Sequence, residues 1–144
     1  MNRIRWQMVR EEGPTSFTVK GAADAATYLI GQGYSDRDRE AFIVLLLNTK
    51  HDLIAEEIVS IGILDGSLIH PREVFKAAVC ASAAAIILAH NHPSGNLQPS
   101  AQDEEVTRRL RSAGGILGIP VLDHIILGAG TESYYSFREK GESW

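Results

Sequence analysis

Two histidines separated by one residue, His90 and His92, stand at the end of an apolar stretch. Residues two apart in a strand point to the same face, with Cα atoms about 6.5–7 Å apart. Two imidazoles placed in this way can converge on one metal ion, at about 2.0–2.1 Å from each ring nitrogen for zinc. The pair needs a third ligand before it defines a metal site.

Asp103 is the expected third ligand. The loop PSGNLQP after the histidines contains prolines and a glycine that favour a chain reversal. A helix is expected to begin at Ser100, and side chains of a first helical turn point back toward the helix N-terminus. The pattern Ser100-x-x-Asp103 also fits a variant of the capping box, a helix N-terminal motif. The two roles are compatible, because Ser100 can cap the helix while Asp103 binds the metal.

Two histidines, one carboxylate and an open fourth position are typical of a catalytic zinc site rather than a closed structural one. We therefore expect one Zn²⁺ per chain. Such an ion lowers the pKa of a bound water toward about 7, and a base must accept that water's proton. Glu40 is the candidate base, because it opens a strongly apolar strand in which a carboxylate has no packing role.

The helices and strands that position these residues are predicted from the periodicity of apolar residues and from the positions of glycine, proline and capping residues. Helices are expected at 21–33, from 70 to about 81, and at 100–115; strands are expected at 40–50, 53–62, 83–90, 120–128 and 133–137. The run 40–50 is continuously apolar, as in a strand buried on both faces. The helix at 100–115 has an N-cap, acids in its first turn and an apolar stripe, and Gly114-Gly115 is expected to end it.

Helices and strands thus alternate around one sheet, with a hairpin between 40–50 and 53–62. The fold class is mixed α/β: a three-layer α-β-α sandwich around a mixed central sheet, not a doubly wound fold. At 144 residues the chain has the length of one domain. We assign that domain to residues 21–144, and residues 1–20 to an N-terminal arm or an edge strand.

Composition limits the class of protein. The net charge is −4, and the densest basic cluster, in 108–111, follows two glutamates, so direct nucleic-acid binding is not expected. No apolar run approaches the about 20 residues of a membrane span, and the start lacks the apolar segment of a secretory signal. We expect a cytoplasmic protein in which the single cysteine, Cys80, is a small buried thiol.

The pattern H-x-H, seven residues, Ser, two residues, Asp resembles the JAMM signature of MPN-domain metalloproteases, and His90, His92, Ser100 and Asp103 meet it without a gap. Glu40, just before AFIVLLLNTK, occupies the place of the family's upstream glutamate. More closely, residues 35–140 resemble the RadC family of bacterial proteins. That likeness is carried by REAFIVLLLNTKH, GILDGSLIHPREVFKAA, AAAIILAHNHPSG, VLDHIILG and YYSFREKG.

The resemblance implies a zinc hydrolase with a fold related to the cytidine deaminases. Glu40 would be the general base and then the acid toward the leaving amine, and Ser100 would help to stabilise a tetrahedral oxyanion. The implied substrate is a peptide or isopeptide bond in a peptide or protein, and a homodimer is a further possibility. The family name also implies DNA repair. The open alternative is a non-catalytic DNA-repair accessory or protein-interaction scaffold.

The sequence departs from the family patterns at three points. Asn91 stands where deubiquitinating members have Ser or Thr, and Asn96 stands where an acidic residue is expected. About 20 residues precede the first expected helix, so the helical DNA-binding module that RadC-like proteins often carry is not expected.

A cytidine-type deaminase is excluded by the single cysteine. The letters His-Asn-His do not make an HNH nuclease, whose motif is spread over a ββα unit.

Three further polar residues have no assigned role. His70 precedes the proline of a helix, where a structural hydrogen bond is the simpler interpretation. Asp123 and His124 lie together inside an otherwise apolar strand. One of them is either a partner of a metal ligand or half of a buried polar pair.

Overall fold

The computed structural model describes residues 1–9, 11, 16–62, 69–141 and 144. In chain order, the elements are α1 (Ala22–Gly31), the 3₁₀ helix η1 (Tyr34–Asp36), β1 (Ala41–Leu47), β2 (Leu53–Ile61), α2 (Pro71–Cys80), β3 (Ala85–His92), α3 (Ala101–Leu117), β4 (Val121–Gly128), β5 (Tyr134–Ser136) and α4 (Phe137–Lys140). The short helices η1 and α4 are additions to the elements expected from the sequence.

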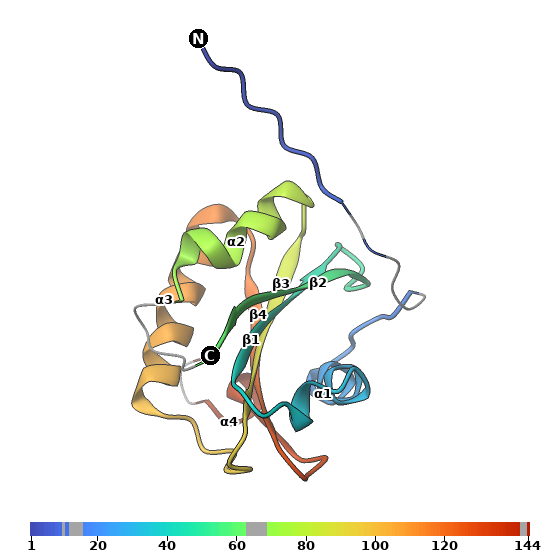
Figure 1. Ribbon diagram of the computed structural model, residues 1–144, viewed down its shortest axis with the longest axis vertical. Helices are drawn as coiled ribbons and strands as arrows, with labels where there is room; N and C mark the ends of the chain where they lie inside the picture. The colour runs from blue at the N-terminus through green and yellow to red at the C-terminus, as the bar shows by residue number, and fades with distance from the viewer. Residues whose placement is uncertain (10, 12–15, 63–68, 142–143) are drawn as a thin grey trace.

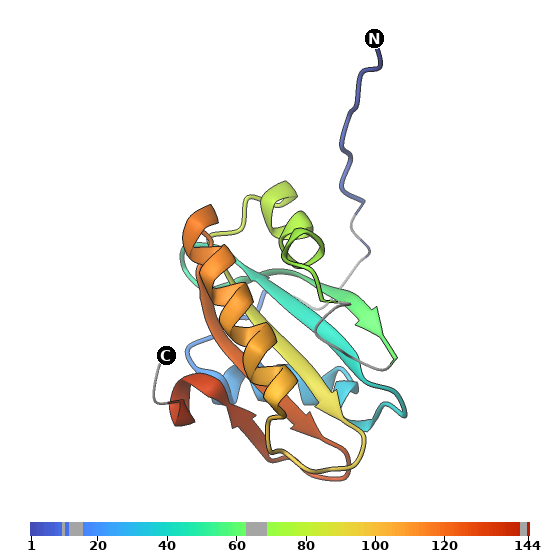
Figure 2. The same ribbon diagram turned by 90° about the vertical axis from the view of Figure 1, so that its left-hand side faces the viewer.

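The strands form one mixed sheet in the order β2-β1-β3-β4-β5. β3 and β4 are parallel, and the other neighbouring pairs are antiparallel. The parallel pair is joined through α3, which crosses one face of the sheet together with α2, while α1 covers the opposite face (Figures 1 and 2). This arrangement confirms the predicted three-layer α/β sandwich.

The central strand β1 shows why its sequence is apolar at every position. Ile43, Leu45 and Leu47 pack into the core beneath α1. Phe42, Val44 and Leu46 pack into a second core beneath α2 and α3. Both faces of the strand are therefore buried, and alternation in the sequence disappears as expected for such a strand.

The helix α3 begins as expected and ends later than expected. The side chain of Ser100 accepts from the backbone N–H of Asp103, and Asp103 in turn accepts from the backbone N–H of Ser100, a complete capping box. The predicted end at Gly114-Gly115 is wrong, because the helix continues to Leu117 and ends at Gly118, whose φ is 70°. Gly114 has another reason to be glycine: a Cβ there would lie 2.5 Å from the carbonyl oxygen of Ile119.

The prediction of a buried Cys80 is also wrong. The thiol is exposed at the last residue of α2. The side of α2 that faces the sheet is formed by Val74, Phe75 and Ala78, and Cys80 lies outside this stripe. The alanine-rich sequence around Cys80 therefore does not place it in the core.

The N-terminal segment pairs with the body through residues 17–19. Val19 donates to the carbonyl of His51, and Leu53 donates to that of Phe17, so residues 17–19 lie antiparallel to the start of β2. Residues 1–9 carry no helix or strand and run away from the body (Figure 1). Residues 10 and 12–15 of the predicted arm lie outside the described residues. Within the described ranges, no helix has the length and apolarity needed to cross a membrane.

Candidate metal centre

Three side chains from β3 and α3 converge at the end of the sheet. His90 and His92 lie at the end of β3, which extends two residues beyond its expected end, and they point to the same face because one residue separates them. The Nε2 atoms of the two rings are 2.9 Å apart. Asp103, in the first turn of α3, places Oδ1 3.2 Å from Nε2 of His90 and Oδ2 3.3 Å from Nε2 of His92. The donor atoms of the three residues therefore form one compact group.

The size of this group fits a tetrahedral ion. Zinc lies about 2.0–2.2 Å from nitrogen and oxygen ligands, which makes the edge of the tetrahedron about 3.3–3.6 Å. The separations between the donor atoms are 2.9, 3.2 and 3.3 Å. A small outward movement of the two rings would therefore complete three corners. The side chains of His92 and Asp103 are 13% and 16% exposed, so solvent reaches this side of the group.

The ring of His92 is oriented by a backbone carbonyl. Its Nδ1 lies 2.6 Å from the carbonyl oxygen of Asn96, in the loop after β3. A carbonyl oxygen only accepts, so Nδ1 carries a hydrogen and donates it. In the neutral ring the lone pair is then on Nε2, the atom that faces Asp103. This is the tautomer that a metal ligand of this geometry requires.

Behind His90 lies a second histidine from β4. Nδ1 of His90 is 2.7 Å from Nε2 of His124, and Nδ1 of His124 is 2.6 Å from Oγ1 of Thr107 in α3. The ring of His124 has no exposed surface and stacks on Phe137, with Phe42 at its edge. Burial, followed by the charge of His90, lowers the pKa of His124 well below its ordinary value.

Electrostatics couple His92 to Asp103. Burial alone would raise the pKa of the Asp103 carboxyl, but its contacts with His90 and His92 in their protonated forms outweigh burial and lower this pKa strongly. The hydrogen bond to Asp103 raises the pKa of His92 against the effect of burial, with smaller contributions from the Asn96 carbonyl and the charge of Glu40. In the absence of metal, a proton on His92 is therefore stabilised at the centre of the group.

Glu40 directly precedes β1, the strand that pairs with β3 in the sheet. β1 and β3 are antiparallel, with Phe42 opposite His90. Glu40 is half-buried and stands two residues before Phe42; continuing the alternation of the strand would place it opposite His92 and on the same face. Its charge contributes to the raised pKa of His92. Its role as a base stays a prediction.

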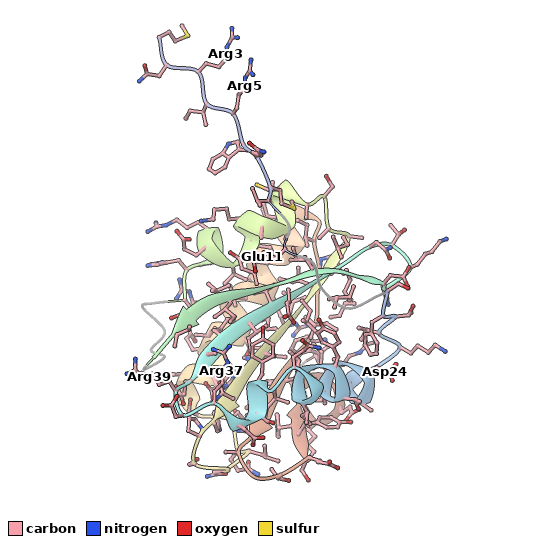
Figure 3. The ribbon with its side chains drawn as sticks, turned by 45° about the vertical axis from the view of Figure 1, so that its right-hand side comes forward. Arg3, Arg5, Glu11, Asp24, Arg37 and Arg39 are labelled. Carbon is pink, nitrogen blue, oxygen red and sulfur yellow. The ribbon has the colours of Figure 1, made fainter. Side chains whose placement is uncertain are left out.

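Asn91, between the two histidines, fixes the segment that carries Glu40. Its side chain is fully buried and points to the opposite face of β3. Oδ1 accepts from the backbone N–H of Ala41 at 2.7 Å, and Nδ2 donates to the carbonyl of Arg39 at 3.0 Å. Figure 3 shows Arg37 and Arg39 in this segment at the start of β1, far from Arg3 and Arg5 on the N-terminal segment. One residue thus ties the backbone on either side of Glu40 to the strand of the histidines.

Of the remaining polar residues, His124 contacts the candidate site, whereas Asp123 has a structural role. Asp123 accepts from Oγ of Ser136 at 2.6 Å and from the backbone N–H of Arg138, so it joins β4 to the chain after β5. Its neighbour His124 is the one that contacts a predicted ligand. His70 is the residue before α2 and makes no side-chain cap. Sequence reasoning missed Thr107, although it stands one helical turn after Asp103, where its side chain reaches the same region.

Comparison with known proteins places these residues in a family. A family model described as a RadC-like JAB domain matches residues 19–142, which is most of the chain. The chain belongs to the RadC-like JAB domain family. A relative from Rubrobacter xylanophilus, named UPF0758 protein, is 52% identical over 123 residues, covering 85% of this chain and 52% of the relative.

Two further relatives carry the same name. The protein from Symbiobacterium thermophilum is 58% identical over 102 residues, covering 71% of this chain and 43% of the relative. The protein from Bacillus cereus is 45% identical over 135 residues, covering 94% of this chain and 59% of the relative. The chain spans about half the length of the curated relatives it matches. The RadC-like domain therefore corresponds to one part of those proteins.

Proposed function

We propose that this chain is a zinc-dependent hydrolase of the JAMM type that cleaves peptide or isopeptide bonds in a peptide or protein substrate. The observation that carries the proposal is the convergence of two imidazole nitrogens and one carboxylate at a partly exposed point, with separations slightly below the edges of a zinc tetrahedron. Three protein ligands with a fourth corner open to solvent distinguish catalytic zinc sites from structural ones. We further propose that the protein is cytoplasmic.

Each residue of the group has a distinct task in this proposal. His90, His92 and Asp103 would hold the zinc ion, which, when bound, supplies a polarised water and a Lewis acid. Glu40 would accept a proton from that water and return it to the leaving amine. Oγ of Ser100 already accepts a hydrogen bond from Asp103, so its own O–H remains able to donate to a developing oxyanion.

The first prediction concerns metal content. We expect about one zinc per chain, because three ligands and water complete a tetrahedron. The variants His90→Ala and His92→Ala should lose it, while His51→Asn, which removes an exposed histidine in the turn after β1, should keep it. Elemental analysis of protein purified without chelator measures this. Zinc retained by the His90→Ala/His92→Ala double variant would place the metal elsewhere.

The second prediction separates an enzyme from a scaffold. Glu40 is not a ligand in the proposal, so Glu40→Gln should keep zinc and fold while turnover falls by about 10²–10⁴-fold, the usual contribution of a general base. Glu104→Gln removes an exposed carboxylate in the first turn of α3 and serves as the control. The assay is hydrolysis of a substrate from a peptide-library screen, with zinc measured on every variant. Full activity of Glu40→Gln would rule out this mechanism.

A further inference from the structure

The hydrogen bonds behind His90 end on a group that can only accept. Oγ1 of Thr107 lies 2.6 Å from the carbonyl oxygen of Asp103, to which it donates. A threonine hydroxyl has one hydrogen, so toward Nδ1 of His124, also 2.6 Å away, the same oxygen must accept. Nδ1 of His124 therefore carries a hydrogen. The carbonyl of Asp103 determines this direction of donation.

This direction of donation also determines which nitrogen of the proposed ligand His90 carries the hydrogen. A neutral imidazole with its hydrogen on Nδ1 has its lone pair on Nε2. Nε2 of His124 faces Nδ1 of His90 at 2.7 Å, so His90 is the donor in this contact. The lone pair of His90 is then on Nε2, which faces Asp103 and His92. Full burial of His124 between two aromatic side chains favours the neutral form of its ring.

We propose that Thr107 and His124 are positioning residues that hold His90 in the one tautomer able to bind a metal ion through Nε2. The inference rests on the proposed metal site and names the residues that prepare it. Asp103 acts at both ends of the arrangement. Its carboxylate meets Nε2 of His90, and its backbone carbonyl starts the hydrogen-bond series that frees this atom.

The change Thr107→Val tests the proposal, because it keeps the shape of the side chain and removes the hydroxyl. Without an acceptor at Nδ1, His124 gains by placing its hydrogen on Nε2, where Nδ1 of His90 can accept it. His90 then carries its own hydrogen on Nε2, directed at the metal position. We expect zinc affinity to fall by about 10–100-fold, the usual effect of removing a partner of a metal-binding histidine. A competition titration with a chromophoric chelator measures it.

Nuclear magnetic resonance of the imidazole nitrogens provides a readout that a general loss of stability would not move. In metal-free wild-type protein at about pH 8, above the ordinary pKa of histidine, His90 should carry its hydrogen on Nδ1. In Thr107→Val the population should shift toward Nε2–H. A wild-type His90 with its hydrogen mainly on Nε2 would overturn the proposal, whether or not the variant folds.

Two control variants complete the experiment. Thr107→Ser restores the hydroxyl and should restore both the tautomer and the zinc affinity. Thr27→Val makes the same exchange at an exposed position of α1, on the other face of the sheet, and should change neither. Wild-type zinc affinity in Thr107→Val would sink the proposal. If wild-type protein binds no zinc, the proposed function fails instead, and the tautomer in the metal-free chain still decides the roles of Thr107 and His124.

Discussion

Asp103 combines roles that are usually divided among several residues. Its Oδ2 accepts from the backbone of Ser100, both carboxylate oxygens face a histidine, and its carbonyl accepts from Thr107. The start of α3 and the metal centre therefore share one set of hydrogen bonds. A substitution at Asp103 would weaken the helix cap and the candidate metal site together, so its effect on metal binding alone is best judged beside stability measurements.

A pH dependence follows from the pair formed by His92 and Asp103. The raised pKa of His92 stabilises the metal-free fold below about pH 6.5, and this contribution is lost as pH rises through the folded-state pKa. The lowered pKa of Asp103 stabilises the fold above about pH 3.8, and this contribution is lost as pH falls through its folded-state pKa. In chelator, the free energy of unfolding should therefore fall when pH rises above about 6.5.

Urea unfolding at a series of pH values measures this step, and His92→Gln should remove it. His51→Asn, in the exposed turn after β1, should leave it in place. The same competition between a proton and a metal ion predicts weaker zinc binding as pH falls through the pKa of His92. Zinc affinity that is independent of pH in this range would contradict the assignment of His92 as a ligand.

The predictability of the site depends on sequence distance. His90, His92 and Asp103 fall within one strand, loop and helix start, so local spacing was enough to group them. His124 was only one of two alternatives, because its contact with His90 depends on the register between the parallel strands β3 and β4. A shift by one residue would exchange the faces of Asp123 and His124, and periodicity cannot fix that register.

At the scale of elements, β1 and α3 show what patterns can and cannot predict. The run in β1 has one interpretation, because seven apolar residues in succession suit a strand buried on both faces. The pair Gly114-Gly115 has two interpretations, because glycine is favoured both at helix ends and where two backbones pack closely. In α3 it serves packing, since the chain returning toward β4 passes over Gly114. The helix end belongs to Gly118.

Two adjacent glycine substitutions test this view of α3. Gly115→Ala adds a methyl group to open space in a helix and should raise the free energy of unfolding by about 0.5–1 kcal/mol. Gly114→Ala brings a Cβ to 2.5 Å from the Ile119 carbonyl and should lower it by about 1–3 kcal/mol. Chemical denaturation of both variants measures the difference. Equal effects of the two substitutions would show that Gly114 is not needed for packing.

At the scale of the whole molecule, a wide groove lies away from the candidate metal centre. It runs between β2, α2, the C-terminal end of α3 and the N-terminal segment, and Trp6, Phe75, Val79 and Ile116 are among its lining residues. The candidate site is at the other end of α3, about 24 Å away along the helix. Concavity and donor geometry therefore point to different ends of the molecule, and donor geometry points to the ends of β3 and α3.

Truncation at the N-terminus tests how much of this chain the fold requires. Trp6 is 76% and Val9 80% exposed, so removal of residues 1–9 should change neither zinc content nor stability. Removal of residues 1–20 also takes away Val19, which is buried beneath α1, and the backbone hydrogen bonds to the start of β2. We expect a loss of about 1.5–3 kcal/mol or more from Val19 alone. Urea midpoints of the two truncated forms against the full chain measure it.

The position of β2 at the end of the strand order bears on self-association. An outer strand offers its backbone to a second copy, and antiparallel pairing of two β2 strands would extend the sheet across both molecules. Glu56 and Glu57 stand in the middle of the strand, so in such a pairing the carboxylates of one copy would face those of the other. Like charges directly opposite each other destabilise a strand pair. A homodimer of this chain should therefore use a surface other than the β2 edge.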